Sequence, residues 1–138
     1  MFYIKGDNAE LKCGKKSKRL RMNFSVDDVR CHIMAKSRVV EETPFGPEVL
    51  VYKIRGKIFA ILRFEDEVGQ INLKCDPERA LQLRDEHETI LPGYHMNKKH
   101  WNTLVIDGSL SSHLVGELID HSYQLVVKGM PKKTREIL

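Results

Sequence analysis

The residues best suited to chemistry lie in one short stretch, from Gly93 to Thr103. It holds two histidines, two lysines, two asparagines, a tyrosine and the only tryptophan of the 138-residue chain. Cationic donors, amides and flat aromatic rings can together hold phosphates, hydrogen-bond to bases and stack on them. The stretch therefore indicates a recognition surface, although its residue types do not point to any particular reaction.

A second group of basic residues surrounds the predicted tight turn Arg55-Gly56. Alternate residues of a strand project to the same side, so these cations should form one cluster able to contact phosphates. We expect the lysines of both groups to bind the backbone of a nucleic acid, and the residues after them to read or stack on bases. The expected nucleic-acid contacts are Lys53, Arg55, Lys57, Lys98, Lys99, His100, Trp101 and Asn102.

The same loop could instead line a pocket for a small molecule or a partner, as concave sites with a few polar groups do. Phe45 lies between two prolines, and we expect it to be a plug in the core, with ligand contact as the alternative. The residues of this second hypothesis are Phe45, Asn72, Lys74, Tyr94, His95 and Trp101.

An enzyme is the weakest of the three hypotheses. His95, His100 and Cys75 could bind a metal or react, but no cysteine pair or His-Glu-x-x-His pattern accompanies them. Cys75 follows the apolar side of a predicted strand, which favours a buried small hydrophobe over a nucleophile. Neither a glycine-rich phosphate loop nor Gly-x-Ser-x-Gly is present. We expect no catalytic residue, no cofactor and no bound metal.

The positive charge of the chain is concentrated at its start. Residues 1–21 carry seven basic and two acidic side chains, a net charge of +5, whereas the net charge of the whole chain is +4. Residues 22–138 carry sixteen basic and seventeen acidic side chains, a net charge of −1. Any affinity of the folded part for DNA must therefore come from local patches.

Hydrophobic periodicity predicts one α+β domain over residues 22–138, with 1–21 as a flexible basic extension. The extension could be a nucleic-acid-binding arm, or Met22 could be an alternative start. Tight turns imply an antiparallel sheet of about four to five strands packed against two to three helices. The predicted helices are 26–37, 77–87 and 112–128, and the predicted strands are 49–54, 57–64, 70–75 and 101–106.

The compartment is expected to be the cytoplasm. The chain has no apolar run long enough to span a membrane and no secretory signal at its start. Three cysteines without metal-site spacing are typical of a reducing environment. The sequence does not determine the oligomeric state, and a monomer is slightly favoured.

Several blocks of the chain resemble the MmcQ/YjbR family. They include Pro44-Phe45-Gly46-Pro47-Glu48, Asn72-Leu73-Lys74-Cys75-Asp76-Pro77-Glu78, the stretch from Pro92 to Thr103, and Ile119–Val127. The resemblance covers roughly residues 22–135 and implies a CyaY (frataxin)-like fold. It also implies a protein that binds DNA through a double wing of hairpins. Our leading hypothesis is therefore a non-enzymatic DNA-binding protein, with a regulatory role as one option.

Overall fold

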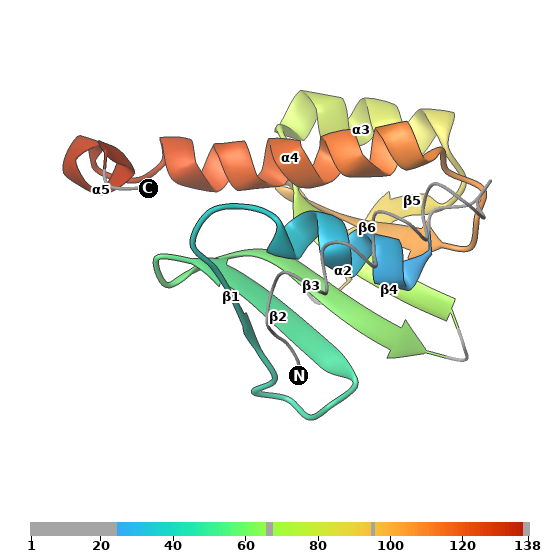
Figure 1. Ribbon diagram of the computed structural model, residues 1–138. Coiled ribbons are helices and arrows are strands. Elements are labelled where there is room, and N and C mark those ends of the chain that lie inside the picture. Colours follow the sequence, from blue (N-terminus) through green and yellow to red (C-terminus); the bar gives the residue numbers. More distant parts are fainter. Residues whose placement is uncertain (1–24, 66–67, 95, 137–138) are drawn as a thin grey trace.

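The computed structural model describes residues 25–65, 68–94 and 96–136 (Figure 1). The predicted extension 1–21 lies outside them. The described helices are α2 (Val26–Met34), α3 (Pro77–Glu86), α4 (Ser112–Lys128) and α5 (Lys132–Glu136). The described strands are β1 (Val39–Glu42), β2 (Val49–Ile54), β3 (Lys57–Glu65), β4 (Val68–Lys74), β5 (Ile90–Pro92) and β6 (Trp101–Ile106).

The strands form a single antiparallel sheet in the order β1-β2-β3-β4-β6-β5. The predicted α+β class is confirmed, with six described strands instead of four to five. The two unpredicted strands, β1 and β5, are the short edge strands, with four and three residues. Such short segments show too little alternation to be recognised from the sequence.

The described helices α2, α3 and α4 cover one face of the sheet, which we call the helical face (Figure 1). The predicted helix 112–128 is confirmed as α4, and the residues at helical spacing along one side of it are all buried: Val115, Leu118, Ile119, Ser122 and Val126. Apolar side chains of α4 and of β3 and β4 form the centre of the core. The core thus lies between one long helix and the middle of the sheet.

Capping side chains fix where α2 and α3 begin. Ser25 and Asp28 form a capping box at the start of α2, and Asp76 caps α3 ahead of Pro77. The predicted helix 26–37 is three residues too long, because α2 ends at Met34 and Arg38 follows at a φ of 63°. A left-handed residue cannot continue a right-handed helix.

Ser122 connects α4 to two strands. Its side chain is fully buried, donates to the carbonyl oxygen of Phe59 at 2.6 Å and accepts from the amide of Lys74 at 2.9 Å. Phe59 lies within the register shift between β2 and β3, between the residues that pair with Tyr52 and Lys53. The hydroxyl therefore satisfies two backbone groups where the sheet ladder is irregular.

A second polar cluster ties α2 to the edge of the sheet. Glu41 accepts hydrogen bonds from Arg30 at 2.7 and 2.9 Å and from the hydroxyl of Tyr52 at 2.7 Å. Burial alone would raise the pKa of Glu41, but these hydrogen bonds outweigh burial and lower it. The same burial, together with the contact to Glu41, raises the pKa of Tyr52. The carboxylate is thus held in its charged form.

The opposite side of the sheet, which we call the outer face, differs from the sequence prediction in β4. The alternation of apolar and polar residues in this strand predicts that Asn72, on its polar side, faces solvent, yet Asn72 is 1% exposed. Its carbonyl accepts from the hydroxyl of Thr103 on β6 at 2.5 Å, and its amide donates to the carbonyl oxygen of Tyr94 at 3.3 Å. Val51 and Ile61 are also buried on this face. Asn72 therefore belongs to an interior hydrogen-bond network.

Candidate functional site

Two hairpins point toward the same end of the sheet. The first joins β2 and β3 at Arg55-Gly56, and the second joins β5 and β6 through residues 93–100. Because β3, β4 and β6 are successive antiparallel neighbours, the start of β3 and the start of β6 share one end. Three strand spacings separate the midlines of the two hairpins, or about 14 Å. The predicted basic groups of both hairpins thus lie at one end of the sheet.

The first hairpin exposes two of its three predicted cations. Arg55 and Gly56 have φ angles of 52° and 82°, the pattern of a two-residue turn with both central residues left-handed. Arg55 and Lys57 are exposed, whereas the amine of Lys53 lies 3.0 Å from a carboxylate oxygen of Glu42. The charge of Lys53 is partly neutralised, so Arg55 and Lys57 are the available cations.

The second hairpin exposes Lys98 and Lys99, and its loop is held by Arg84 of α3. The Arg84 guanidinium donates to the side-chain carbonyl of Asn102 at 2.7 Å, to the backbone carbonyl of Trp101 at 3.3 Å and to that of Lys98. The sequence reasoning missed Arg84, because an arginine in the last turn of a helix carries no local signal. The loop that presents the lysines is therefore positioned by a helix.

Asn102 does not reach the surface. It is 1% exposed, bonded to Arg84, and its amide lies 3.5 Å from the carbonyl oxygen of Ala80. Trp101 and His100 are half-buried, and the alternation of β6 places the Trp101 side chain on the outer face. Of the three residues expected to read or stack on bases, Asn102 lies in the interior.

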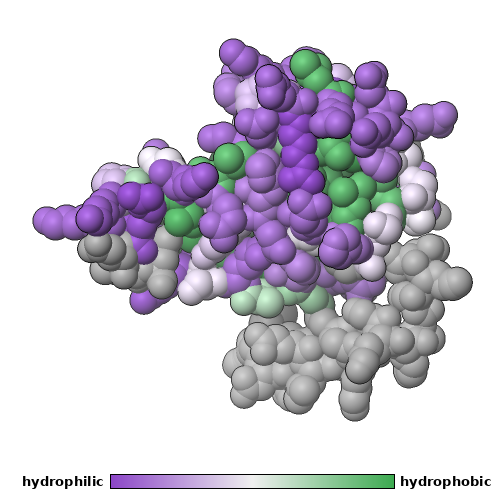
Figure 2. Space-filling view, turned by 90° about the horizontal axis from the view of Figure 1, so that it is seen from above, coloured by the Kyte–Doolittle hydropathy of each residue, from purple (hydrophilic) through white to green (hydrophobic). Residues whose placement is uncertain are grey.

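Exposed basic and acidic side chains gather at opposite ends of the sheet. The C-terminal part of α4 also lies at the hairpin end of the sheet, which we call the basic end. There the hydroxyl of Tyr123 donates to the carbonyl oxygen of Ser37, just before the start of β1. The short helix α5 follows it there as a hydrophilic projection (Figures 1 and 2). Among the described side chains, the acidic residues Asp76 and Glu78 lie at this end. Its exposed cations are Arg38, Arg55, Lys57, Lys98, Lys99, Lys128, Lys132, Lys133 and Arg135.

The opposite end, which we call the acidic end, gathers exposed carboxylates from separate segments of the described residues. They lie in the first turn of α2, just before β2, at and just after the end of α3, and directly after β6, and they are separated in the sequence by up to eighty residues. These acidic residues are Asp27, Glu48, Glu86, Glu88 and Asp107. A nearly neutral domain thus has a strong internal charge asymmetry, which the net charge conceals.

The described residues of the pocket hypothesis lie in different parts of the fold. Phe45 lies in the β1–β2 loop at the acidic end and is 72% exposed, so its prediction as a core plug is wrong. Asn72 is buried. Tyr94, Lys74 and Trp101 lie on the outer face, and His95 lies outside the described residues. The structure therefore brings together part of this set, on a face of the sheet.

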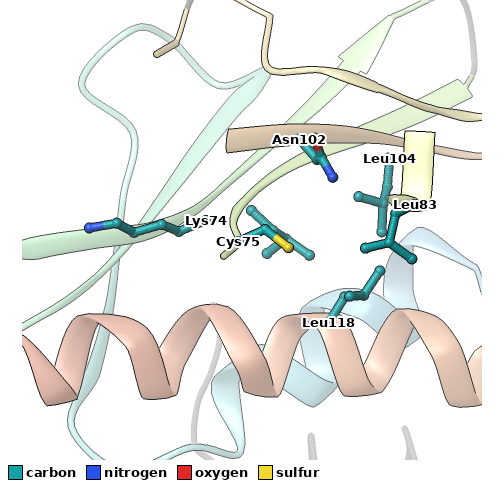
Figure 3. Close-up of a pocket in the computed structure, with 7 residues that line it drawn as sticks. Lys74, Cys75, Leu83, Asn102, Leu104 and Leu118 are labelled. Carbon is teal, nitrogen blue, oxygen red and sulfur yellow. The ribbon is translucent and has the colours of Figure 1, made fainter. Parts of the chain in front are cut away.

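A small cavity lies on the helical face, and Lys74 is the one described residue of the pocket hypothesis that borders it (Figure 3). It is about 10 Å³, enough for one water molecule, and Lys74 extends away from it. Its lining consists of Leu73, Lys74, Cys75, Leu83, Asn102, Leu104 and Leu118. A cavity of this size does not accommodate an organic ligand.

Of the three candidates for reactive chemistry, Cys75 lies in the core. Cys75 is 4% exposed, and burial raises the pKa of its thiol, which opposes thiolate formation. The Nε2 atom of His121 accepts from the amide of Asp76 at 3.2 Å, and burial followed by the charge of Arg79 lowers the pKa of this imidazole. Within residues 25–65, 68–94 and 96–136, no three histidine, cysteine or acidic side chains form a metal-binding group. No helix in the same ranges could cross a membrane.

Comparison with known proteins places this arrangement in a family. The YjbR family model matches residues 34–125. The chain is 44% identical over 93 residues to the uncharacterised protein YbdF of Escherichia coli O157:H7, covering 67% of this chain and 76% of YbdF. It is 30% identical over 115 residues to the uncharacterised YjbR of Escherichia coli K12, covering 83% of this chain and 98% of YjbR.

A solved structure shares the fold. The crystal structure of the Deinococcus radiodurans protein DR2400, a DUF419 domain, superposes with a TM-score of 0.76 at 39% identity. The superposition covers 83% of this chain and 87% of that one. Sequence, family model and fold agree, and the chain belongs to the YjbR family.

Proposed function

We propose that this protein binds DNA through its basic end, with the two hairpins as paired contacts to the phosphate backbone. The observation that carries the proposal is the charge segregation, which gives a domain of net charge −1 one strongly cationic end. A duplex is a dense line of negative charge, so such a domain is attracted and oriented with its basic end toward the DNA.

The spacing of the hairpins favours the major groove. Their midlines are about 14 Å apart, close to the roughly 12 Å width of the major groove and more than twice the 6 Å of the minor groove. Arg55 and Lys57 on one hairpin could then contact one strand while Lys98 and Lys99 contact the other. This is a double-wing arrangement, with β5 completing the second wing.

The side chains at the basic end favour binding with little sequence dependence. Lysine and arginine contacts to phosphate position a protein on DNA without reading the bases. Asn102, the amide best suited to read a base edge, is buried and bonded to Arg84. The proposal involves no catalytic step and no cofactor.

The test compares two double variants of the full chain, each losing two positive charges. Lys98→Gln/Lys99→Gln alters the second hairpin, and Lys15→Gln/Lys16→Gln alters the basic segment that precedes the domain. Binding to a labelled mixed-sequence duplex would be measured by fluorescence anisotropy from 50 to 300 mM salt. We expect the hairpin variant to reduce the slope of log K against log salt by about 1.8, since each phosphate contributes about 0.9.

The control variant separates the hairpins from the N-terminal segment. The proposal would be overturned if the hairpin variant bound the duplex as the unaltered chain does while the N-terminal variant had lost its salt-sensitive binding. Duplexes of unrelated sequence should bind with affinities within about tenfold of one another, because phosphate contacts carry no sequence information.

A further inference from the structure

Beside the second hairpin, the outer face carries two pairs of an aromatic ring and a cation. The guanidinium carbon of Arg63 lies 5.5 Å from the centre of the Tyr94 ring, a cation–π contact. Lys74 and Trp101 are direct cross-strand partners on β4 and β6. Four residues from three strands and a loop thus form one aromatic and cationic surface.

Tyr94 is held in place by its backbone. Its amide donates to the hydroxyl of Thr103 at 2.8 Å, and its carbonyl oxygen accepts from the amide of Asn72 at 3.3 Å. Thr103 and Asn72 are 2% and 1% exposed, so the anchors lie in the interior while the ring is 46% exposed. A ring fixed before binding loses little conformational entropy when a ligand stacks on it.

Trp101 is anchored in the same region. Gly93 packs so closely on it that a Cβ added to the glycine would lie 2.7 Å from the Cβ of Trp101. Tyr94 directly follows Gly93 in the chain, so the attachment points of the two rings are close together. Both rings are therefore within reach of neighbouring nucleotides of one strand.

We propose that this outer-face surface binds the unpaired bases of single-stranded nucleic acid by stacking on Tyr94 and Trp101. Bases inside a duplex are already stacked on each other and cannot offer their faces, whereas a single strand can. Arg63 and Lys74 supply the positive charge that tracks the backbone. The inference rests on the proposed function, because Lys98 and Lys99 lie on the same hairpin and would hold the adjoining phosphates.

The single tryptophan makes the test direct, because its fluorescence reports on this surface alone. The full chain would be titrated with a dodecamer of deoxythymidine and, separately, with a duplex of the same length. We expect the single strand to quench Trp101 and the duplex to leave its emission nearly unchanged. Tyr94→Ala should weaken single-strand binding about tenfold, in line with the loss of one stacked base.

Tyr94→Phe is the matched control, since it keeps the ring and should bind within about twofold of the original chain. The melting temperature of both variants shows whether the fold is intact. Duplex binding without quenching by the single strand, or full single-strand affinity in a folded Tyr94→Ala variant, would overturn the stacking site alone. If neither nucleic acid binds, the proposed function fails as well.

Discussion

Replacing Arg55 with asparagine should stabilise the protein and weaken its binding to DNA. Arg55 occupies the first central position of the β2–β3 turn with a φ of 52°. A left-handed backbone brings the Cβ of most residues too close to the neighbouring carbonyl, whereas asparagine tolerates this conformation and is common in such turns. Arg55 therefore lowers the stability of the folded protein, and its exposed positive charge is expected to contribute to DNA binding in return.

The two effects can be estimated from the structure. The left-handed conformation costs an ordinary residue about 1–2 kcal/mol, and asparagine should recover about half of this, or about 0.5–1 kcal/mol. For a chain of this size that corresponds to about 2–3 °C in the melting temperature. The lost charge removes one expected phosphate contact, which lowers the affinity roughly eightfold at 0.1 M salt if the slope falls by about 0.9.

Thermal unfolding and duplex binding would be measured on the same preparations of the original chain, Arg55→Asn and Lys57→Gln. Lys57→Gln removes a neighbouring charge of the same hairpin without relieving a left-handed residue. Lys57→Gln should weaken DNA binding about as much as Arg55→Asn does, and its melting temperature should stay within about 1 °C of that of the original chain. Our reasoning about the turn is refuted if Arg55→Asn melts lower than the original chain. Unchanged DNA affinity in both variants would instead refute the role of the hairpin.

Three further predictions concern the framework of the site. Ser122→Ala leaves two buried backbone groups without a partner and should cost about 2–4 kcal/mol in urea unfolding, against less than about 0.5 kcal/mol for the exposed Ser109→Ala. Gly93→Ala places a Cβ 2.9 Å from the carbonyl oxygen of Trp101, so it should lower the melting temperature and shift the fluorescence of that tryptophan. Glu41 has a lowered pKa in the folded protein, so its stabilising effect is complete above the unfolded-state pKa and is lost as the pH falls through the folded one. The difference in melting temperature between the original chain and Glu41→Gln should therefore be largest near pH 7 and shrink toward pH 3.

Long, periodic elements were predictable because each contains its own evidence. The α4 helix shows five buried positions at helical spacing, and β2 and β3 flank a two-residue turn. The strands β1 and β5 were missed because each exists mainly through its pairing with a longer neighbour. Without β5, the second hairpin could be read only as a loop.

Individual site residues were harder to predict than elements. Alternation correctly places Asn72 opposite the apolar side of β4, but nothing near it in the chain shows that Thr103 and Tyr94 bury it there. Asn102 looked like a base-reading amide beside two lysines, yet Arg84, eighteen residues away, holds it in the interior. Burial depends on contacts between distant segments, so local patterns could not reveal it.

By itself, the sequence determined the family, the α+β class, the longer elements and which residues carry charge. The tertiary structure alone decided where those charges gather, because antiparallel pairing brings the ends of distant segments together. Basic residues from the first hairpin, the second hairpin and the C-terminal helices meet at one end, while five separate acidic residues meet at the other. A net charge of −1 is a sum over residues, and it contains no information about this separation in space.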